Sequence, residues 1–194
     1  MAATTYTGTR NGDRLSARTS GDTLEGLAGN DILSSGTTSL SGVKMFGGDG
    51  NDTLIAKELD GLIDGGAGID TVQFSAAVSS ANLTNAELVS IEKVQITNTG
   101  SAAYDFSVQA EALEITGGRA NDNITGGGGN DTITGSAWAD TLYGGSGNDL
   151  LSGGYYGDTY IYNSGDADAG ETIVEPTSGT EIDTISMVTS TIFL

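Results

Sequence analysis

Residues 126–134 read GGGGNDTIT, and this stretch decides how the rest of the chain is interpreted. Glycine loses more backbone freedom on ordering than any other residue, so a run of glycines opposes a fixed structure. Asp131 follows the run, and an isoleucine then stands between two threonines. A turn of this composition becomes stable only if something binds to it, and the carboxylate indicates a cation.

The same nine-residue pattern recurs along the chain. From Gly117 the successive segments read GGRANDNIT, GGGGNDTIT, GSAWADTLY, GGSGNDLLS and GGYYGDTYI. Each has aspartate at position 6 and an apolar or aromatic residue at position 8. Earlier segments keep the frame less regularly: GTRNGDRLS, ARTSGDTLE, GLAGNDILS, GGDGNDTLI, AKELDGLID and GGAGIDTVQ. A repeat of this length predicts a solenoid.

The pattern GGxGxDxUx, where U is a large apolar residue, resembles the RTX, or haemolysin-type, calcium-binding repeats. The resemblance implies an all-β fold, a right-handed parallel β-roll (a β-solenoid) with calcium-filled turns. In such a roll each repeat forms a turn and a short strand, two repeats complete a coil, and the turns align in two rows. The resemblance also implies type I secretion, with folding outside the cell where calcium is plentiful.

Elementary geometry leads to a compatible fold. The middle residue of a three-residue strand points to the face opposite its neighbours, so position 8 faces inward. This predicts a thin core that contains Leu15, Leu24, Leu33, Leu54, Ile63, Val72 and the position-8 residues of the later repeats. Calcium takes about six to eight oxygen ligands from carboxylates and carbonyls, and a row of stacked turns supplies both.

The pairing of turns follows from parity, because each turn faces the turn two repeats away. In the first block one edge carries Asp13, Asp31, Asp52 and Asp70, provided that residues 35–46 form one repeat with an enlarged turn and Met45 inward. The opposite edge has Asp22, for which we expect no in-phase partner and a surface position, and a displaced Asp60.

The second block pairs in the same way. Asp122, Asp140 and Asp158 share one edge, Asp131 pairs with Asp149, and Asp183 stacks on Asp158. The first block gives three pairs and the second gives four, so we expect about seven calcium ions. The predicted carboxylate ligands are Asp13, Asp31, Asp52, Asp70, Asp122, Asp131, Asp140, Asp149, Asp158 and Asp183. The predicted backbone carbonyl ligands belong to Gly26, Gly47, Gly48, Gly50, Gly65, Gly66, Gly68, Gly117, Gly118, Gly126, Gly127, Gly129, Gly135, Gly144, Gly145, Gly147, Gly153 and Gly154.

The motif also predicts the domain organisation. Residues 1–73 form an N-terminal RTX block, 117–161 a C-terminal RTX block, and 162–194 a closing segment with a further repeat at 178–186. Residues 74–116 lack the motif but contain alternating, strand-like runs. We interpret them as a connector that continues the solenoid, the alternative being a small separate insertion. Within the connector, NAELVSI (85–91) predicts a short helical turn.

Composition narrows the function. The chain has 7 basic and 26 acidic residues, a formal net charge of −19, and no histidine or cysteine. This charge argues against nucleic acid and anionic membranes as partners and favours cations. Without histidine, a Ser-His-Asp triad and a zinc HExxH site are impossible, so we expect no enzyme activity here and place any catalytic domain outside the chain. No membrane span and no cleavable signal peptide are visible.

The function predicted from these features is a calcium-binding module of a secreted or surface-exposed bacterial protein. Two carboxylates about 5 Å apart in an effective dielectric of about 20 repel by about 3 kcal/mol, so we expect folding to require calcium. One alternative is a structural or adhesive surface-layer module that self-associates. Another is a carbohydrate-contacting accessory module, attached to a polysaccharide-acting enzyme and binding a surface polysaccharide.

Overall fold

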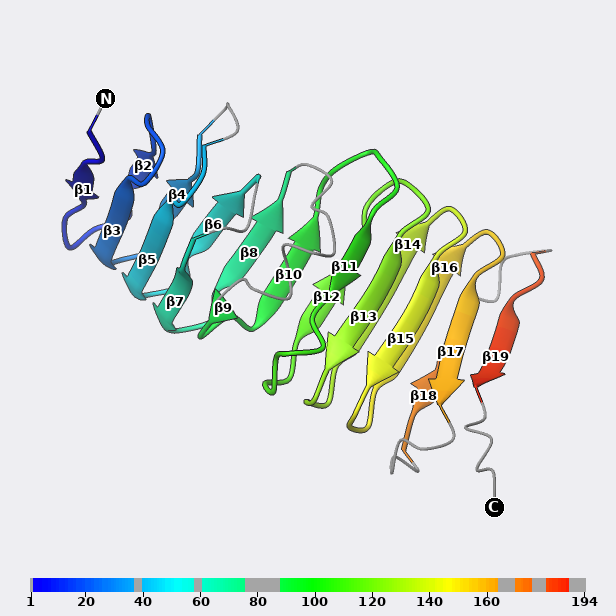
Figure 1. Ribbon diagram of the computed structural model, residues 1–194. Coiled ribbons are helices and arrows are strands. Elements are labelled where there is room, and N and C mark those ends of the chain that lie inside the picture. The colour runs from blue at the N-terminus through cyan, green and yellow to red at the C-terminus, as the bar shows by residue number, and fades with distance from the viewer. Residues whose placement is uncertain are drawn as a thin grey trace, which may run out of the picture. The chain divides into compact units, whose positions relative to one another are not determined.

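The computed structural model describes residues 2–36, 40–57, 61–75, 88–163, 170–175 and 181–188. The chain forms two compact units, Met1–Asn98 and Thr99–Leu194. All regular elements in these described ranges are β-strands, and neighbouring strands within each unit run parallel (Figure 1). No helix in the described part of the chain has the length and apolarity needed to cross a membrane. The all-β, parallel β-solenoid predicted from the repeats is therefore confirmed.

Unit 1 consists of two facing stacks of strands. The odd-numbered strands pair in the order β1-β3-β5-β7-β9 and the even-numbered ones in the order β2-β4-β6-β8-β10. Their bounds are β1 Thr5–Thr7, β2 Arg14–Ser16, β3 Thr23–Ala28, β4 Ile32–Ser34, β5 Lys44–Asp49, β6 Thr53–Ala56, β7 Ile63–Ala67, β8 Thr71–Phe74, β9 Leu88–Val89 and β10 Lys93–Ile96. Each step from one odd strand to the next is one coil of the solenoid.

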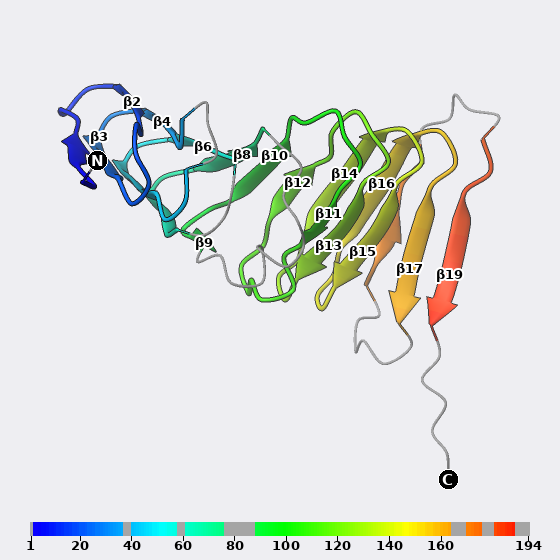
Figure 2. The ribbon, with the colours of Figure 1, turned by 45° about the horizontal axis from the view of Figure 1, so that its top comes forward.

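Unit 2 repeats this arrangement, with β11-β13-β15-β17-β19 in one stack and β12-β14-β16-β18 in the other. Its strands are β11 Ala103–Asp105, β12 Glu114–Thr116, β13 Asn123–Gly127, β14 Thr132–Ala137, β15 Thr141–Gly145, β16 Leu150–Tyr155, β17 Thr159–Asn163, β18 Thr172–Ile173 and β19 Thr184–Val188. Figure 2 shows the stacked strands of each unit from a second direction.

Position 8 of the repeat builds the core of unit 1, because parallel pairing places equivalent side chains directly above one another. In one stack Leu24, Met45 and Ile63 pair in register, and all three are buried. In the other stack the buried ladder consists of Leu33, Leu54, Val72 and Val94. Leu15, in the first coil, is only half-buried. The predicted core positions are thus confirmed away from the end of the unit.

Unit 2 has the same two ladders. The buried members are Tyr104, Ile124, Leu142 and Tyr160 in one stack and Ile115, Ile133 and Leu151 in the other. The last rungs are Ile185, which is 60% exposed, and Ile173, which is 38% exposed. The register of Ile185 on Tyr160 confirms that the frame returns before β19.

The irregular repeats follow the pairing predicted for them, with one correction. The enlarged turn returns the chain to register at β5, where Met45 pairs with Leu24. The short helical turn expected at 85–91 is wrong for its described residues, because Leu88–Val89 form strand β9. Leu88 pairs with Ile63 and completes the buried ladder, so parallel pairing prevails over the local sequence preference.

The adjacent residues Leu150 and Leu151 test the prediction that position 8 of the repeat faces the core. Leu151 is 1% exposed and Leu150 is 40% exposed. In the folded protein we expect Leu151→Ala to lower the free energy of unfolding by about 2–5 kcal/mol, because it leaves a cavity in a thin core. Leu150→Ala serves as the control, with an expected change within about 0.5 kcal/mol. Denaturant unfolding followed by circular dichroism measures both, and equal effects would contradict the assignment.

Candidate metal centre

Three rows of acidic side chains run along the edges of the roll. The Asp13 row lies in unit 1 and contains Asp13, Asp31, Asp52, Asp70 and Glu92. The Asp122 row lies in unit 2 and contains Asp122, Asp140, Asp158 and Asp183. The Asp131 row, also in unit 2, contains Asp131 and Asp149. The structure therefore brings together the aspartates that parity placed together.

Each row is held by hydrogen bonds from backbone to carboxylate. The N–H of Asp31 donates to Oδ1 of Asp52 over 2.7 Å, and the N–H of Asp52 donates to Oδ1 of Asp70 over 2.7 Å. The same bond joins Asp140 to Asp158 over 2.8 Å. One oxygen of each carboxylate is thereby fixed, and its other oxygen, Oδ2, faces the turn of its own repeat.

In one class of turn this second oxygen has no hydrogen-bond donor. We call these the open turns; they are residues 26–31, 47–52, 65–70, 135–140, 144–149 and 153–158. The Oδ2 atoms of Asp31, Asp52, Asp70, Asp140 and Asp158 are buried and accept no hydrogen bond. A buried carboxylate oxygen without a donor is unfavourable unless a proton or a cation meets it.

The open turns share a backbone conformation that explains their glycines. Positions 2 and 4 have positive φ, as at Gly48 (111°) and Gly50 (140°). Glycine adopts this conformation readily, whereas other residues are strained in it. Four non-glycine residues of the open turns also adopt it: Leu27, Ser136, Trp138 and Tyr156.

A second class of turn satisfies the carboxylate internally. In these closed turns, residues 8–13, 17–22, 117–122 and 126–131, the N–H at position 2 donates to Oδ2 of the aspartate. For example, the N–H of Gly127 donates to Asp131 over 2.7 Å. Each closed turn is the first aspartate-bearing turn on its edge of the unit. Asp13, Asp122 and Asp131 therefore already have backbone donors, unlike the aspartates of the open turns.

In several turns the glycine at position 1 lies at a point where oxygens from two turns converge. A Cβ atom on Gly135 would lie 2.6 Å from the carbonyl oxygen of Gly153 and closer still to Oδ2 of Asp140. Gly26 and Gly47 have the same surroundings, each between the Oδ2 of its own turn and the carbonyl of the next turn in the row. Such a cradle suits a hard cation, because its walls are carboxylate and carbonyl oxygens. Calcium therefore fits the residues present.

Burial changes the acidity of these carboxyl groups. Burial raises the pKa of Asp140 to about 7, and the charges of Asp158 and Asp122 add to the effect. Burial likewise raises the pKa of Asp70 to about 6, with three neighbouring carboxylates contributing. Burial also raises the pKa of Asp52, Asp122, Asp131 and Asp158. The rows thus favour a bound positive charge.

Asp22 requires a correction. We expected it at the surface, but its side chain is 0% exposed. Burial alone would raise its pKa, but hydrogen bonds from the N–H groups of Arg18, Thr19 and Thr4 and from the Thr19 hydroxyl outweigh this and lower it. The next coil presents Val43 at the equivalent place, so Asp22 fixes its own turn and has no carboxylate stacked on it from that coil. Asp60 lies outside the described residues.

Two glutamates were missed in the sequence. Glu92 ends the Asp13 row, where its Oε2 accepts the N–H of Asp70 over 2.7 Å. Glu175 lies beside Asp158 and Asp183, and one carboxylate oxygen from each of the three lies within 4.8 Å of the others. A search for aspartate at position 6 could not find either residue. The signal for Glu92 was Val94 two places later, which preserves the spacing of positions 6 and 8.

Position 5 of the turn carries a further ladder that the sequence analysis did not assign. The N–H of Asn51 donates to Oδ1 of Asn30 over 2.9 Å, and the N–H of Asn148 donates to Oδ1 of Asn130 over 2.9 Å. These exposed amides join successive turns outside the carboxylate row. The frequent asparagine before the aspartate was the signal.

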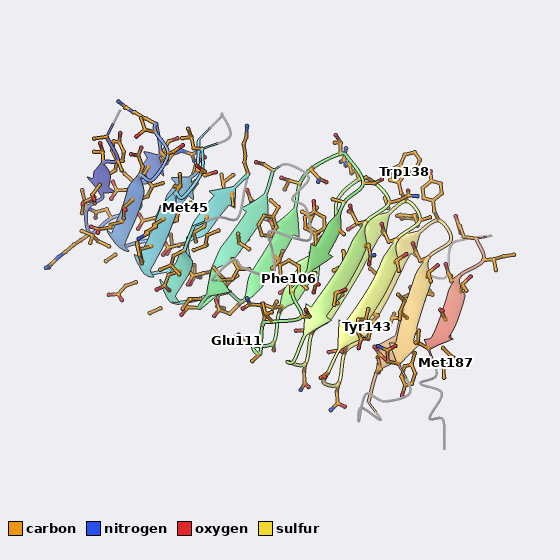
Figure 3. The ribbon with its side chains drawn as sticks, in the orientation of Figure 1. Met45, Phe106, Glu111, Trp138, Tyr143 and Met187 are labelled. Atoms are coloured by element: carbon orange, nitrogen blue, oxygen red, sulfur yellow. The ribbon has the colours of Figure 1, made fainter. Side chains whose placement is uncertain are left out.

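Two open turns carry an aromatic residue at position 4. Trp138 and Tyr156 stack with ring centroids 5.3 Å apart and an angle of 7° between their planes. Figure 3 shows Trp138 projecting from its turn, and its side chain is 49% exposed. The pair links the same two turns that Asp140 and Asp158 join.

Comparison with protein families agrees with this geometry. The model of the RTX calcium-binding nonapeptide repeat matches in four copies, over residues 7–37, 44–58, 114–137 and 130–154. A search of curated proteins finds no match. RTX repeats are typical of secreted bacterial proteins. With its aspartate rows, glycine turns and parallel coils, the chain contains RTX calcium-binding nonapeptide repeats in a parallel β-solenoid.

Proposed function

We propose that this RTX roll is exported or displayed at a bacterial surface and that it folds when its turns bind calcium. The observation that carries the proposal is the set of buried Oδ2 atoms without donors in the open turns. They lie in rows, and those of Asp31, Asp52, Asp70 and Asp140 lie close to a carbonyl oxygen of the next turn. Calcium supplies the positive charge and the oxygen coordination that this arrangement lacks.

The ligand set follows from the two classes of turn. The side chains that would hold calcium directly are Asp31, Asp52, Asp70, Asp140, Asp149, Asp158 and Asp183. Backbone carbonyls of the position-1 glycines complete the sites. Asp13, Asp122 and Asp131 remain candidate ligands, but their Oδ2 atoms would exchange a backbone N–H for the ion. About seven ions remain the expected number.

The charge of unit 2 supports coupled folding. The sequence contains no lysine, arginine or histidine after Arg119, which lies in the turn of Asp122 at the start of the two rows. The coils that follow this turn therefore have no cationic side chain of their own. Since free calcium is abundant outside cells, the folded state would be reached after export, because ligands that bind only the native state stabilise it.

Calcium titration tests the coupling. In a chelator we expect the far-ultraviolet circular dichroism spectrum to be that of a largely disordered chain. Adding calcium to about 10⁻⁴–10⁻³ M, the range of extracellular modules, should produce a strand spectrum. Magnesium at the same concentrations is the control, because it demands a smaller octahedral site. A strand spectrum that is unchanged by chelator would exclude coupled folding.

Two aspartates of a single turn can distinguish the loss of a calcium ligand from the loss of a surface charge. Asp52 is buried within the Asp13 row, whereas Asp49 is exposed at position 3 of the same turn. Asp52→Asn should raise the calcium midpoint of folding by about tenfold or more, because Asp52 contributes to two neighbouring sites. Asp49→Asn removes the same charge and should shift the midpoint by less than about twofold. Equal shifts would mean that the repeat frame does not mark the ligands.

The raised pKa values predict an effect of pH on the calcium-free protein. Asp140 has a pKa of about 7 in the roll against an ordinary value of 3.8, so the folded chain binds this proton more tightly than the unfolded chain. The resulting stability is fully present below about pH 4 and is lost as the pH rises through about 7. In chelator, lowering the pH from about 8 to 5 should therefore increase the strand signal, and at fixed low calcium it should weaken calcium binding. A strand signal that falls over this range would contradict the prediction.

A further inference from the structure

The last described coil of unit 2 differs from the coils before it. Strand β18 pairs with β16 so that Ile173 lies in register with Leu151, and the N–H of Val174 donates to the carbonyl of Leu151 over 2.8 Å. Continuing this register by two residues places Glu175 beside Gly153, at position 1 of the turn. In the open turns position 1 is glycine and offers only its backbone. Here the same position also brings a carboxylate.

Three acidic groups converge at this place. One carboxylate oxygen each from Asp158, Glu175 and Asp183 lies within 4.8 Å of the other two. The row bond between Asp158 N–H and Oδ1 of Asp183, 2.9 Å long, fixes two of them relative to each other. In the described residues no other group of three carboxylates is as close.

The group also contains acceptors with no donor. Asp158 is 1% exposed, and its Oδ2 accepts no hydrogen bond. Oε1 of Glu175 is likewise buried and accepts none. Beside them, a Cβ on Gly153 would collide with Oδ2 of Asp158, so position 1 leaves room for no side chain there. With no cationic side chain after Arg119, the coils around the group cannot neutralise it.

We propose that Asp158, Glu175 and Asp183 form a calcium site with three carboxylate ligands, in which Glu175 is a ligand from outside the nonapeptide motif. The inference rests on the proposed calcium binding. It goes beyond it by naming Glu175 as a ligand and by predicting which site of unit 2 has the highest calcium affinity. Calcium affinity rises with the number of charged ligands. The other turns stack one aspartate on the next, so the three-carboxylate site is the tightest in unit 2.

The test uses matched glutamate variants. Glu175→Gln keeps the shape of the side chain and removes its charge, whereas Glu181→Gln removes an exposed charge that acts on Asp158 only from a distance. Calcium is titrated into the full chain and followed by calorimetry. We expect Glu175→Gln to weaken the tightest class of sites by about tenfold or more. Glu181→Gln should change it by less than about twofold.

Each result bears on the proposal. If both variants titrate like the wild type, or if both are weakened equally, Glu175 is not a ligand and the proposal is overturned while calcium binding by the roll stands. If the wild type binds no calcium, the proposed function fails as well. Should Glu175→Gln not reach the wild-type strand signal at saturating calcium, Glu175→Asp decides. A ligand role predicts that this variant, which keeps the carboxylate, binds calcium more tightly than Glu175→Gln. If Glu175→Asp binds calcium no more tightly than Glu175→Gln, the proposal is overturned.

Discussion

A buried carboxylate that the chain itself satisfies at only one oxygen is the constraint on which the roll depends. The backbone bond from the neighbouring coil fixes Oδ1 and sets the spacing of the coils. The other oxygen then faces a turn of glycines and carbonyls and must meet a proton or a cation. Because no described strand buries more than two apolar side chains, the hydrophobic core can offset little of the cost of an unneutralised charge. We therefore expect the stability of the fold to depend on the calcium concentration and the pH of the solution.

Much of the architecture could be predicted because position in the repeat determines environment. Parallel pairing copies each residue onto its equivalent in the next coil, so the periods of aspartate and leucine in the sequence become ladders in space. The same logic placed Met45 inward after an enlarged turn and stacked Asp183 on Asp158. In these regular coils the position of a residue in the repeat predicts both its burial and the residue that stacks on it.

The parts that could not be predicted are those where a coil has no equivalent neighbour. Asp22 was expected at the surface because no aspartate stacks on it, yet its turn folds around the carboxylate and buries it. Glu92 and Glu175 act at the ends of rows, where the repeat no longer dictates the residue type. The distinction between open and closed turns is also invisible in the sequence, since GGGGND closes and GGSGND opens. It depends on what precedes the turn in its row.

The sequence also does not reveal that some open turns form without glycine. Leu27 and Tyr156 both adopt the strained backbone conformation of the open turn, at a cost of about 1–3 kcal/mol each.

The enlarged turn of unit 1 has a consequence for how such a protein can diversify. Along the Asp13 row the bonded residues are separated by 18 positions in the regular coils, but by 21 between Asp31 and Asp52. The three additional residues fall between Leu33 and Met45, in the opposite half of the coil, and the carboxylate row continues without interruption. In this coil one edge of the solenoid keeps its length while the other tolerates an insertion. Evolution, or a protein engineer, can graft new sequence onto the tolerant edge without altering the carboxylate row.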